Sequence, residues 1–468
     1  MTFFGSAGTG GMSEASENIL AADIAQLREL ATAAPRDAEH LVNNLKEIYR
    51  AIYFVDFARY DIEGVRAAAP RLMQEIFELR LAVRSQIPEW TARGLMTRTA
   101  QSALRDCFRA SRYAGDLVGE VYLGHPRLAP GQAPQSALSG GDPVMHINPE
   151  FASTPFELKP GDVILQRGMV HNSAAIARIG DVDSQFSHLC IVARDANGTL
   201  IIVEALIEVG STITPLAKSL GHSVGRAIVF RHRDSALAAR ASEFVHDYVA
   251  KTLAPVHNPV LYDFTMTLGD YKQFYCSKLV RFAFDRASEG RVLLPPFTTM
   301  LDMNNRDFLN RIGVATTETF APGDMELATD FDVVAEWRDY RVTSELRLKD
   351  MIMTKLFEWM DIHGYKFKPD FKARAIALGG RLSSRFSKGA QELIASVTGA
   401  VVPPNMRGKT IAAVAMLHMT AEPIYKELQD LENEAIRKTG RQLHPREVFE
   451  TLEKIRLRMG RRIGYLAR

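Results

Sequence analysis

Most of this chain carries apolar residues at helical spacing, and its short β-branched runs are confined to one central segment. Between residue 161 and about residue 230, apolar runs such as Val163 to Leu165, Leu189 to Ala193 and Leu200 to Ala205 alternate with turn sequences. Before and after this segment, apolar residues recur every three to four positions, which is typical of amphipathic helices. The pattern predicts an α+β fold, with one sheet-forming domain between two helical regions.

The length of 468 residues is enough for about three domains. Stripes such as Leu72, Ile76 and Leu79 predict helices over residues 14 to 125, and similar stripes return after residue 342. Between the first helices and the central runs, Pro, Gly and Ser predict a linker. We expect a helical region at 1–125, a linker at 126–158, the sheet-forming domain at 159–335 and a second helical region at 336–468.

Charge and targeting signals exclude several classes of protein. The 57 basic and 55 acidic residues leave a formal charge of +2, so no nucleic-acid partner is expected. No apolar stretch approaches the roughly 20 residues of a membrane span. The first residues, Met1 to Gly5, lack the basic and apolar regions of a secretory signal, so we expect a cytoplasmic location.

A β-hairpin with a histidine and a carboxylate is predicted in the central segment. His188 begins the strand that ends near residue 194, a turn follows at 195–198, and Glu204 lies near the end of the next strand. A pairing centred on residue 196 places His188 opposite Glu204. A two-residue turn at 197–198 places it opposite Ile207 instead, and a pairing centred on residue 198 favours Glu208. Either glutamate is a candidate partner for the imidazole.

Cys276 is the strongest candidate for a reactive thiol among the three cysteines. Apolar residues at helical spacing follow it, so it lies near a helix N-terminus, where the helix dipole and free N–H groups lower a thiol pKa. Thiol catalysis needs a nucleophile, a base within about 3 Å and a group that orients the base. We assign these roles to Cys276, His188 and Glu204, and expect the Cys276 N–H to stabilise an oxyanion. Cys107 and Cys190 are interpreted as packing residues.

Several short motifs together resemble one known family, the permuted NlpC-like cysteine hydrolases of the papain superfamily, in particular its YiiX/YebB-like branch. In chain order, the matching segments are Leu158 to Ile164, Ser187-His188, Val203-Glu204-Ala205, Tyr262-Asp263 and Tyr275-Cys276-Ser277. The resemblance covers about a third of the chain. It implies a circularly permuted papain-like fold in which the histidine and its orienting residue precede the cysteine. It also implies hydrolysis or transfer at an acyl bond. The flanking helical regions match no such pattern.

No cofactor or metal is expected. The segment 407–410 looks like the end of a phosphate-binding loop, but Pro403 occupies the position of the required upstream glycine. The segment 181–185 begins like a calcium loop, but Phe186 and Val192 replace the glycine and the bidentate glutamate. Neither segment therefore predicts a ligand.

A basic segment follows the sheet-forming domain. Between residues 366 and 388, basic side chains alternate with apolar ones; the basic residues are Lys366, Lys368, Lys372, Arg374, Arg381, Arg385 and Lys388. Such a segment is either a helix whose basic face is solvated while its apolar face packs in the core, or a peripheral contact with a membrane.

The most consistent interpretation is a cysteine hydrolase that cleaves a peptide or isopeptide-type amide through an acyl-enzyme on Cys276. A first alternative keeps the thiol chemistry and makes the substrate an acyl lipid at a membrane. A second alternative is a non-catalytic helical interaction protein on a papain-like scaffold, since a fold by itself does not establish activity. The sequence does not define an oligomeric state.

Overall fold

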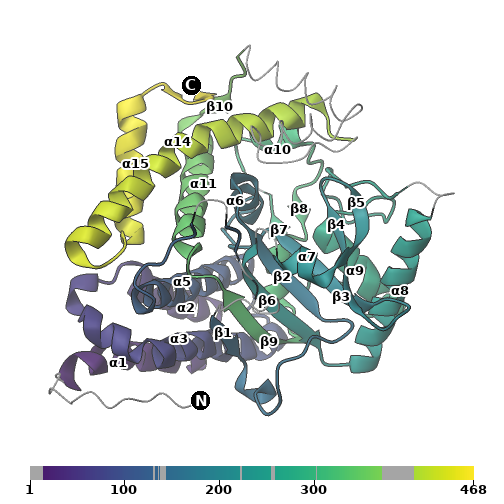
Figure 1. Ribbon diagram of the computed structural model, residues 1–468, viewed down its shortest axis with the longest axis horizontal. Coiled ribbons are helices and arrows are strands. Elements are labelled where there is room, and N and C mark those ends of the chain that lie inside the picture. Colours follow the sequence, from purple (N-terminus) through teal and green to yellow (C-terminus); the bar gives the residue numbers. More distant parts are fainter. Residues whose placement is uncertain are drawn as a thin grey trace.

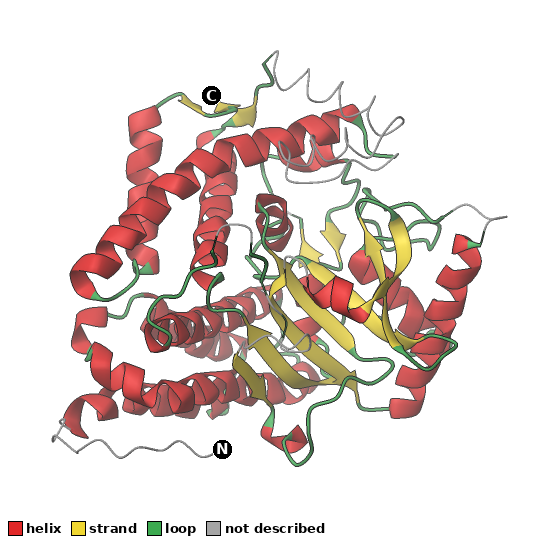
Figure 2. Cartoon of the chain, viewed as in Figure 1, coloured by secondary structure: helices red, strands yellow, loops and turns green. Residues whose placement is uncertain are grey.

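A seven-stranded antiparallel sheet organises the computed structural model, and helices surround it (Figures 1 and 2). The strands lie in the order β1-β9-β6-β2-β3-β4-β5. The structure describes residues 14–129, 132–134, 136, 144–221, 224–254, 259–301, 303–370 and 405–468. The mixture of helices and antiparallel sheet, with helical regions on either side of a central domain, confirms the predicted α+β class.

The bounds of the elements are as follows. The sheet comprises β1 (Val144–Ile147), β2 (Val163–Gly168), β3 (His188–Arg194), β4 (Leu200–Leu206), β5 (Gly210–Pro215), β6 (Val224–His232) and β9 (Phe331–Arg338). The longer helices are α1 (Glu14–Thr32), α2 (Ala38–Tyr53), α3 (Ile62–Ser85), α5 (Arg98–Tyr122), α8 (Ser235–Leu253), α9 (Cys276–Ala287), α11 (Thr343–His363), α14 (Gly408–Thr439) and α15 (Pro445–Met459). Shorter helical elements are η1 (Phe57–Arg59), α4 (Ile87–Ala92), η3 (Pro149–Phe151), α6 (His171–Ala177), α7 (Leu216–Gly221), α10 (Asp307–Ile312) and η4 (Pro322–Leu327). Two-residue strands form β7 (Thr299–Met300), β8 (Glu318–Thr319), β10 (Lys366–Phe367), β11 (Arg462–Ile463) and β12 (Leu466–Ala467).

Both faces of the sheet are covered, which explains why its strands read as nearly continuous apolar runs. On one face, Leu189 and Ile191 of β3 pack into a core shared with α8 and α9. On the other face, Cys190 and Val192 pack into a second core that includes Leu220 of α7. Because successive strand residues point to opposite faces, each strand contributes to both cores.

Two strands of the seven-stranded sheet, β1 and β9, lie outside the segment 161–230 that the sequence marks as sheet-forming. The predicted linker at 126–158 contains β1, which pairs with β9 at one edge of the sheet. The strand β9 lies between β1 and β6 and is buried along most of its length. The prediction that sheet structure is confined to 161–230 is therefore wrong. Pairing with β6, about 100 residues earlier in the chain, decides the conformation of β9, and local apolar alternation alone did not identify it.

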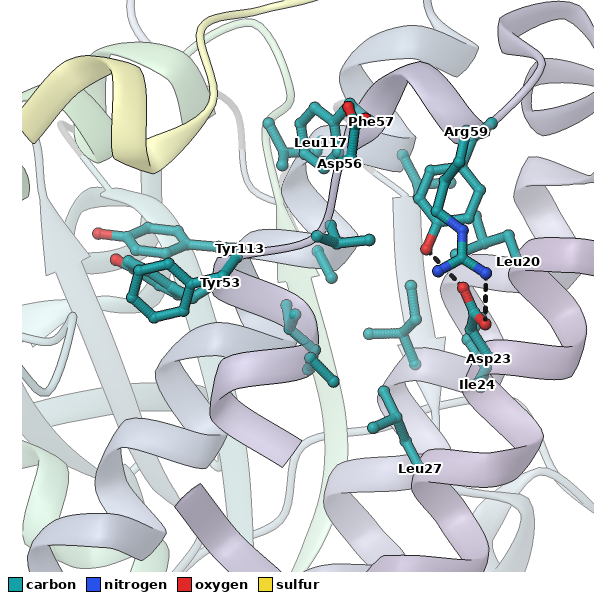
Figure 3. A pocket seen from close by; sticks show the side chains of 18 of the residues that line it. Leu20, Asp23, Ile24, Leu27, Tyr53, Asp56, Phe57, Arg59, Tyr113 and Leu117 are labelled. Atoms are coloured by element: carbon teal, nitrogen blue, oxygen red, sulfur yellow. Dashed lines mark hydrogen bonds and ion pairs between the residues drawn. The ribbon is translucent and has the colours of Figure 1, made fainter. Parts of the chain in front are cut away.

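The N-terminal helices enclose a largely apolar cavity of about 780 Å³ (Figure 3). Aliphatic side chains of α1, α2, α3 and α5 line most of it, and the ion pair between Asp23 and Arg59 lies at one end. All of the lining residues come from positions 20–121 and 441–445. The cavity is therefore separate from the sheet-forming domain and from Cys276.

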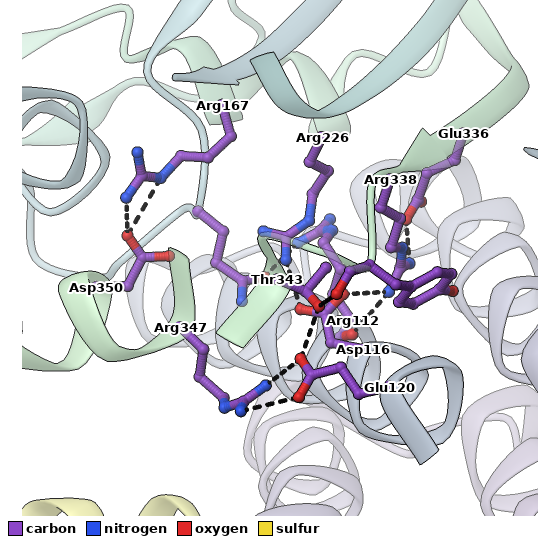
Figure 4. Close-up of polar contacts among 12 residues, drawn as sticks. Arg112, Asp116, Glu120, Arg167, Arg226, Glu336, Arg338, Thr343, Arg347 and Asp350 are labelled. Atoms are coloured by element: carbon purple, nitrogen blue, oxygen red, sulfur yellow. Dashed lines mark hydrogen bonds and ion pairs between the residues drawn. The ribbon is translucent and has the colours of Figure 1, made fainter. Parts of the chain in front are cut away.

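A buried network of charged side chains joins α5 to the sheet and to α11 (Figure 4). The Asp116 carboxylate on α5 accepts hydrogen bonds from Arg226 on β6 at 2.5 Å and from Arg338 on β9 at 2.7 Å. One turn further along α5, Glu120 pairs with Arg347 of α11 at 2.6 Å. All five side chains are at most 2% exposed. The network therefore connects the N-terminal helices to the sheet through desolvated, mutually compensating charges.

The C-terminal helices α11, α14 and α15 form a third packed unit, with Leu428 of α14 and Leu452 of α15 in its core, as their helical spacing predicts. The start of the basic segment is strand β10, which pairs with β12, so its first residues are not helical. The rest of that segment, residues 371–388, lies outside the described residues. None of the helices in the described part of the chain combines the length and apolar character that crossing a bilayer requires.

Candidate active site

Cys276 is the first residue of α9. The preceding residue, Tyr275, is extended and caps the helix, and its hydroxyl lies 2.9 Å from that of Thr319. Apolar residues of α9 at helical spacing are buried against the sheet, as predicted, which places the N-terminus of the helix beside the start of β3. The Cys276 residue is 4% exposed. Its thiol therefore lies at the positive end of the helix dipole, almost out of contact with water.

The two other predicted site residues meet across the hairpin formed by β3 and β4. The His188 Nε2 atom lies 2.8 Å from Oε2 of Glu204. Glu208 makes no such hydrogen bond with His188, although its charge acts on the same region. Of the two candidate glutamates, Glu204 is the hydrogen-bonded partner of the imidazole.

None of the three predicted hairpin registers is correct. The strands pair Ile191 with Val203 and Arg194 with Leu200, which centres the hairpin on Asn197. In this register Glu204 lies opposite Cys190 and reaches His188 along the diagonal on the same face. The cause is a three-residue loop, 196–198, in which Gly198 has a φ of +80°. Asp195 fixes this loop by accepting hydrogen bonds from the backbone N–H groups of residues 197 and 199.

The thiol of Cys276 and the imidazole of His188 lie close enough for each to shift the pKa of the other. Burial alone raises the pKa of Cys276, but the hydrogen bond and charge of His188, together with the N–H of Leu189, hold it below its usual range. Burial alone lowers the pKa of His188, but Cys276 and Glu204 outweigh burial and raise it to about 10. The two groups therefore favour each other's charged forms, the thiolate and the imidazolium.

Two hydroxyl groups hold Glu204 in place. The Ser219 hydroxyl, from α7, donates to Oε2 of Glu204 at 3.2 Å, and Thr214 of β5 also forms a hydrogen bond with this carboxylate. These bonds and His188 keep the pKa of the buried carboxyl low despite burial. Neither residue lies in a recognisable sequence motif: the pairing of β4 with β5 brings Thr214 close to Glu204, and the packing of α7 against β4 brings Ser219 close.

The other two cysteines are fully buried. Burial raises the pKa of Cys107 to about 12 and raises that of Cys190 well above its usual range, so both thiols remain protonated. Cys190 is nevertheless close to the site, because its sulfur lies within 4.8 Å of ligand atoms of both His188 and Glu204. The Gln166 amide donates a hydrogen bond to this sulfur at 3.3 Å.

A buried ion pair supports the beginning of α9. Lys278, two residues after Cys276, donates to Asp263 at 2.9 Å. The second oxygen of Asp263 accepts hydrogen bonds from the backbone and hydroxyl of Thr265. Lys278 and Asp263 therefore tie the helix start to the loop that precedes it.

Residues 157–326 match the family model described as a permuted papain-like amidase enzyme, YaeF/YiiX, C92 family. The match covers somewhat more than a third of the chain and includes Cys276, His188 and Glu204. No curated protein and no solved structure matches the chain significantly. Residues 157–326 are therefore similar to the permuted papain-like amidases, and at a coarse level this similarity supports a cysteine hydrolase of the papain-like class.

Proposed function

We propose that this protein hydrolyses an amide bond of the peptide or isopeptide type through an acyl-enzyme on Cys276. The observation that carries the proposal is that His188 is hydrogen-bonded to Glu204 at 2.8 Å and lies close enough to Cys276 to lower the pKa of its thiol. A nucleophile, its base and an orienting acceptor in this order are the groups that thiol catalysis requires. The family match supports an amide as the substrate bond.

In the first half of the reaction, the Cys276 thiolate attacks the amide carbonyl carbon and forms a tetrahedral oxyanion. The backbone N–H of Cys276, at the start of α9, donates to that oxyanion. The His188 imidazolium then gives its proton to the amide nitrogen as the C–N bond breaks. The amine leaves, and the acyl group remains on the sulfur as a thioester.

In the second half, neutral His188 takes a proton from water, and the resulting hydroxide attacks the thioester carbonyl. The tetrahedral intermediate collapses, the C–S bond breaks, and the carboxylic acid leaves. The thiolate and imidazolium are restored. Throughout, Glu204 accepts a hydrogen bond from His188 Nε2, so that the other ring nitrogen faces the sulfur.

The two alternatives have less support. The comparisons give none to an acyl-lipid substrate, and the segment proposed for membrane contact lies mostly outside the described residues. A non-catalytic scaffold does not require a buried thiol paired with an imidazole and a carboxylate. Such a set of groups is costly to bury and is typical of functional sites.

Selective alkylation tests the proposal. At pH 6 to 7, iodoacetamide is expected to modify Cys276 well before Cys107 and Cys190, because only Cys276 has a lowered thiol pKa. The rate should fall as the pH drops through that lowered pKa, and the midpoint of this fall should lie below the usual thiol pKa. Peptide mapping by mass spectrometry gives the order of labelling.

His188→Ala is the informative comparison for this experiment. Without the imidazolium, the Cys276 pKa should rise toward or above its usual value of about 8.5, so labelling at pH 6 to 7 should slow by about tenfold or more. Equal labelling of the three cysteines in the native protein, or no effect of His188→Ala, would remove the basis for the proposed function.

Replacing Glu204 by glutamine tests the orienting residue. The amide still accepts a hydrogen bond but carries no charge, so the raised pKa of His188 should fall and the alkaline limb of the pH–rate profile should move to lower pH. We expect kcat/KM to fall about 10- to 100-fold, since orientation is part of a general acid–base contribution of about 10² to 10⁴. A pH profile of hydrolysis of fluorogenic peptide amides measures both effects. A larger loss in Glu208→Gln than in Glu204→Gln would contradict the assignment.

A further inference from the structure

A second cluster of ligating side chains lies away from the thiol, between the sheet-forming domain and the C-terminal helices. His171 is the first residue of α6, which follows β2, whereas His418 and Glu422 are on α14. Ligand atoms of the three residues lie within 4.8 Å of one another. In the described part of the chain, α6 packs against both α11 and α14 (Figure 1).

We infer that His171, His418 and Glu422 form a binding site for a divalent transition metal, with zinc the ion that these ligands fit best. Two imidazoles and one carboxylate suit zinc, and three protein ligands leave a fourth tetrahedral position for water.

The backbone already arranges the ligands for chelation. His418 and Glu422 are four residues apart on one helix and therefore lie on the same face. The Nε2 atom of His171 lies 3.0 Å from Oε2 of Glu422, close to the separation of two ligands around one zinc ion with bonds of about 2.0 to 2.2 Å. His418 is only partly buried, and the centre of its ring lies 5.3 Å from the centre of the His171 ring.

The buried imidazole of His171 is otherwise poorly satisfied. The residue is 1% exposed, its Nε2 atom faces Glu422, and no hydrogen-bond partner for Nδ1 is present among the described residues.

Two lysines lie near the cluster: Lys349 is compensated by other groups, and Lys426 pairs with Glu422 itself. The Lys349 ammonium pairs with Glu345, donates to the carbonyl of Met169 at 2.8 Å and lies 5.2 Å from the ring centre of Tyr425. Lys426 lies 3.7 Å from Oε1 of Glu422. That contact leaves Oε2, the oxygen nearest His171, available to a metal ion.

A bound metal would connect the sheet-forming domain to the C-terminal helices directly. His171 follows β2, and the backbone N–H of Gly168 in β2 donates to the Ser187 hydroxyl at 3.1 Å, next to His188. The proposed site therefore lies within a few residues of the hairpin that carries the imidazole, but it shares no ligand with the thiol site.

Zinc titration of the Cys276→Ser protein tests this inference, since that variant lacks the thiolate that would itself bind zinc. We expect one equivalent of zinc to bind by calorimetry and to raise the melting temperature. His418→Ala and Glu422→Gln, each in the Cys276→Ser background, should weaken binding at least about 100-fold, because each removes one of three ligands. Glu422→Gln preserves the size of the side chain, so it can be used for the zinc titration if the His418→Ala variant does not fold. The matched control is His246→Ala, which removes a histidine paired with Asp247 on α8 and should bind zinc normally.

Cobalt(II) identifies the ligands independently of affinity. At the proposed site, cobalt should give visible d–d bands without a sulfur-to-cobalt charge-transfer band in the near ultraviolet. A strong charge-transfer band would assign the metal to Cys190, beside His188 and Glu204, and would overturn the inference. No zinc binding by the Cys276→Ser protein, or binding that survives both ligand variants, would also overturn it. Because no readout depends on turnover, these results are independent of the proposed amidase activity.

Discussion

Cys276→Ala is expected to lower amide hydrolysis by about 10⁴-fold or more, close to the effect of removing the whole catalytic group. The variant has no nucleophile, so no thioester forms, and nucleophile and base act as a unit. His188→Ala should give a loss of similar size, and the double variant should be little worse than either single variant. Steady-state hydrolysis of a panel of fluorogenic peptide amides and lysine isopeptides measures the loss.

Intact-mass analysis with a slow substrate provides the direct check. The native protein should gain the mass of one acyl group, and Cys276→Ala should gain none. Cys107→Ala is the matched control, because this thiol lies in the core formed by the N-terminal helices and has a raised pKa. An acyl adduct on Cys276→Ala, or additive losses in the double variant, would contradict the mechanism.

Asp116→Ala is expected to lower the free energy of unfolding by about 3 to 5 kcal/mol, the largest stability effect that we predict. The substitution leaves Arg226 and Arg338 buried without the carboxylate that both of them contact. Removing one partner from a buried ionic network costs about this much: Arg226 loses its carboxylate while it stays out of water, and Arg338 keeps only its pair with Glu336. Urea denaturation followed by circular dichroism and tryptophan fluorescence measures the change.

Glu89→Ala is the control for this experiment. Glu89 pairs with Arg93 on the surface of α4, where both side chains are at least 36% exposed. Glu89→Ala should lower the free energy of unfolding by about 1 kcal/mol or less, which is the usual contribution of an exposed ion pair. Similar effects of the two variants would show that the network around Asp116 does not connect the helices to the sheet as its geometry indicates.

The sequence was most informative where the responsible physics is local. Apolar spacing predicted the helices α14 and α15 correctly and most of their buried stripes, but Leu431 and Met459, toward the ends of the predicted stripes, are exposed. The same spacing after Cys276 placed the thiol at a helix start, where dipole and free N–H groups act on it. The motifs around His188, Glu204 and Cys276 indicated the permuted papain-like family, which the family match confirmed.

Predictions failed where distant parts of the chain decide the outcome. A turn sequence is compatible with several hairpin registers, and a three-residue loop stabilised by Asp195 selected one that had not been considered. Glu204 contacts His188 diagonally across the two strands, so the predicted pair is in contact although the register differs from all those predicted. Strand β9 was missed because its partner β6 lies far away in the chain.

The sequence by itself determined most helices of the two flanking regions, the position of Cys276 at a helix start and the family that the central segment resembles, because periodicity and short motifs encode local structure directly. Only the tertiary structure decided that Glu204 rather than Glu208 bonds the imidazole, that Thr214 and Ser219 support it, and that His171 meets α14. The physical reason is that such contacts depend on loop geometry and on the packing of elements far apart in the chain, and no local pattern records either.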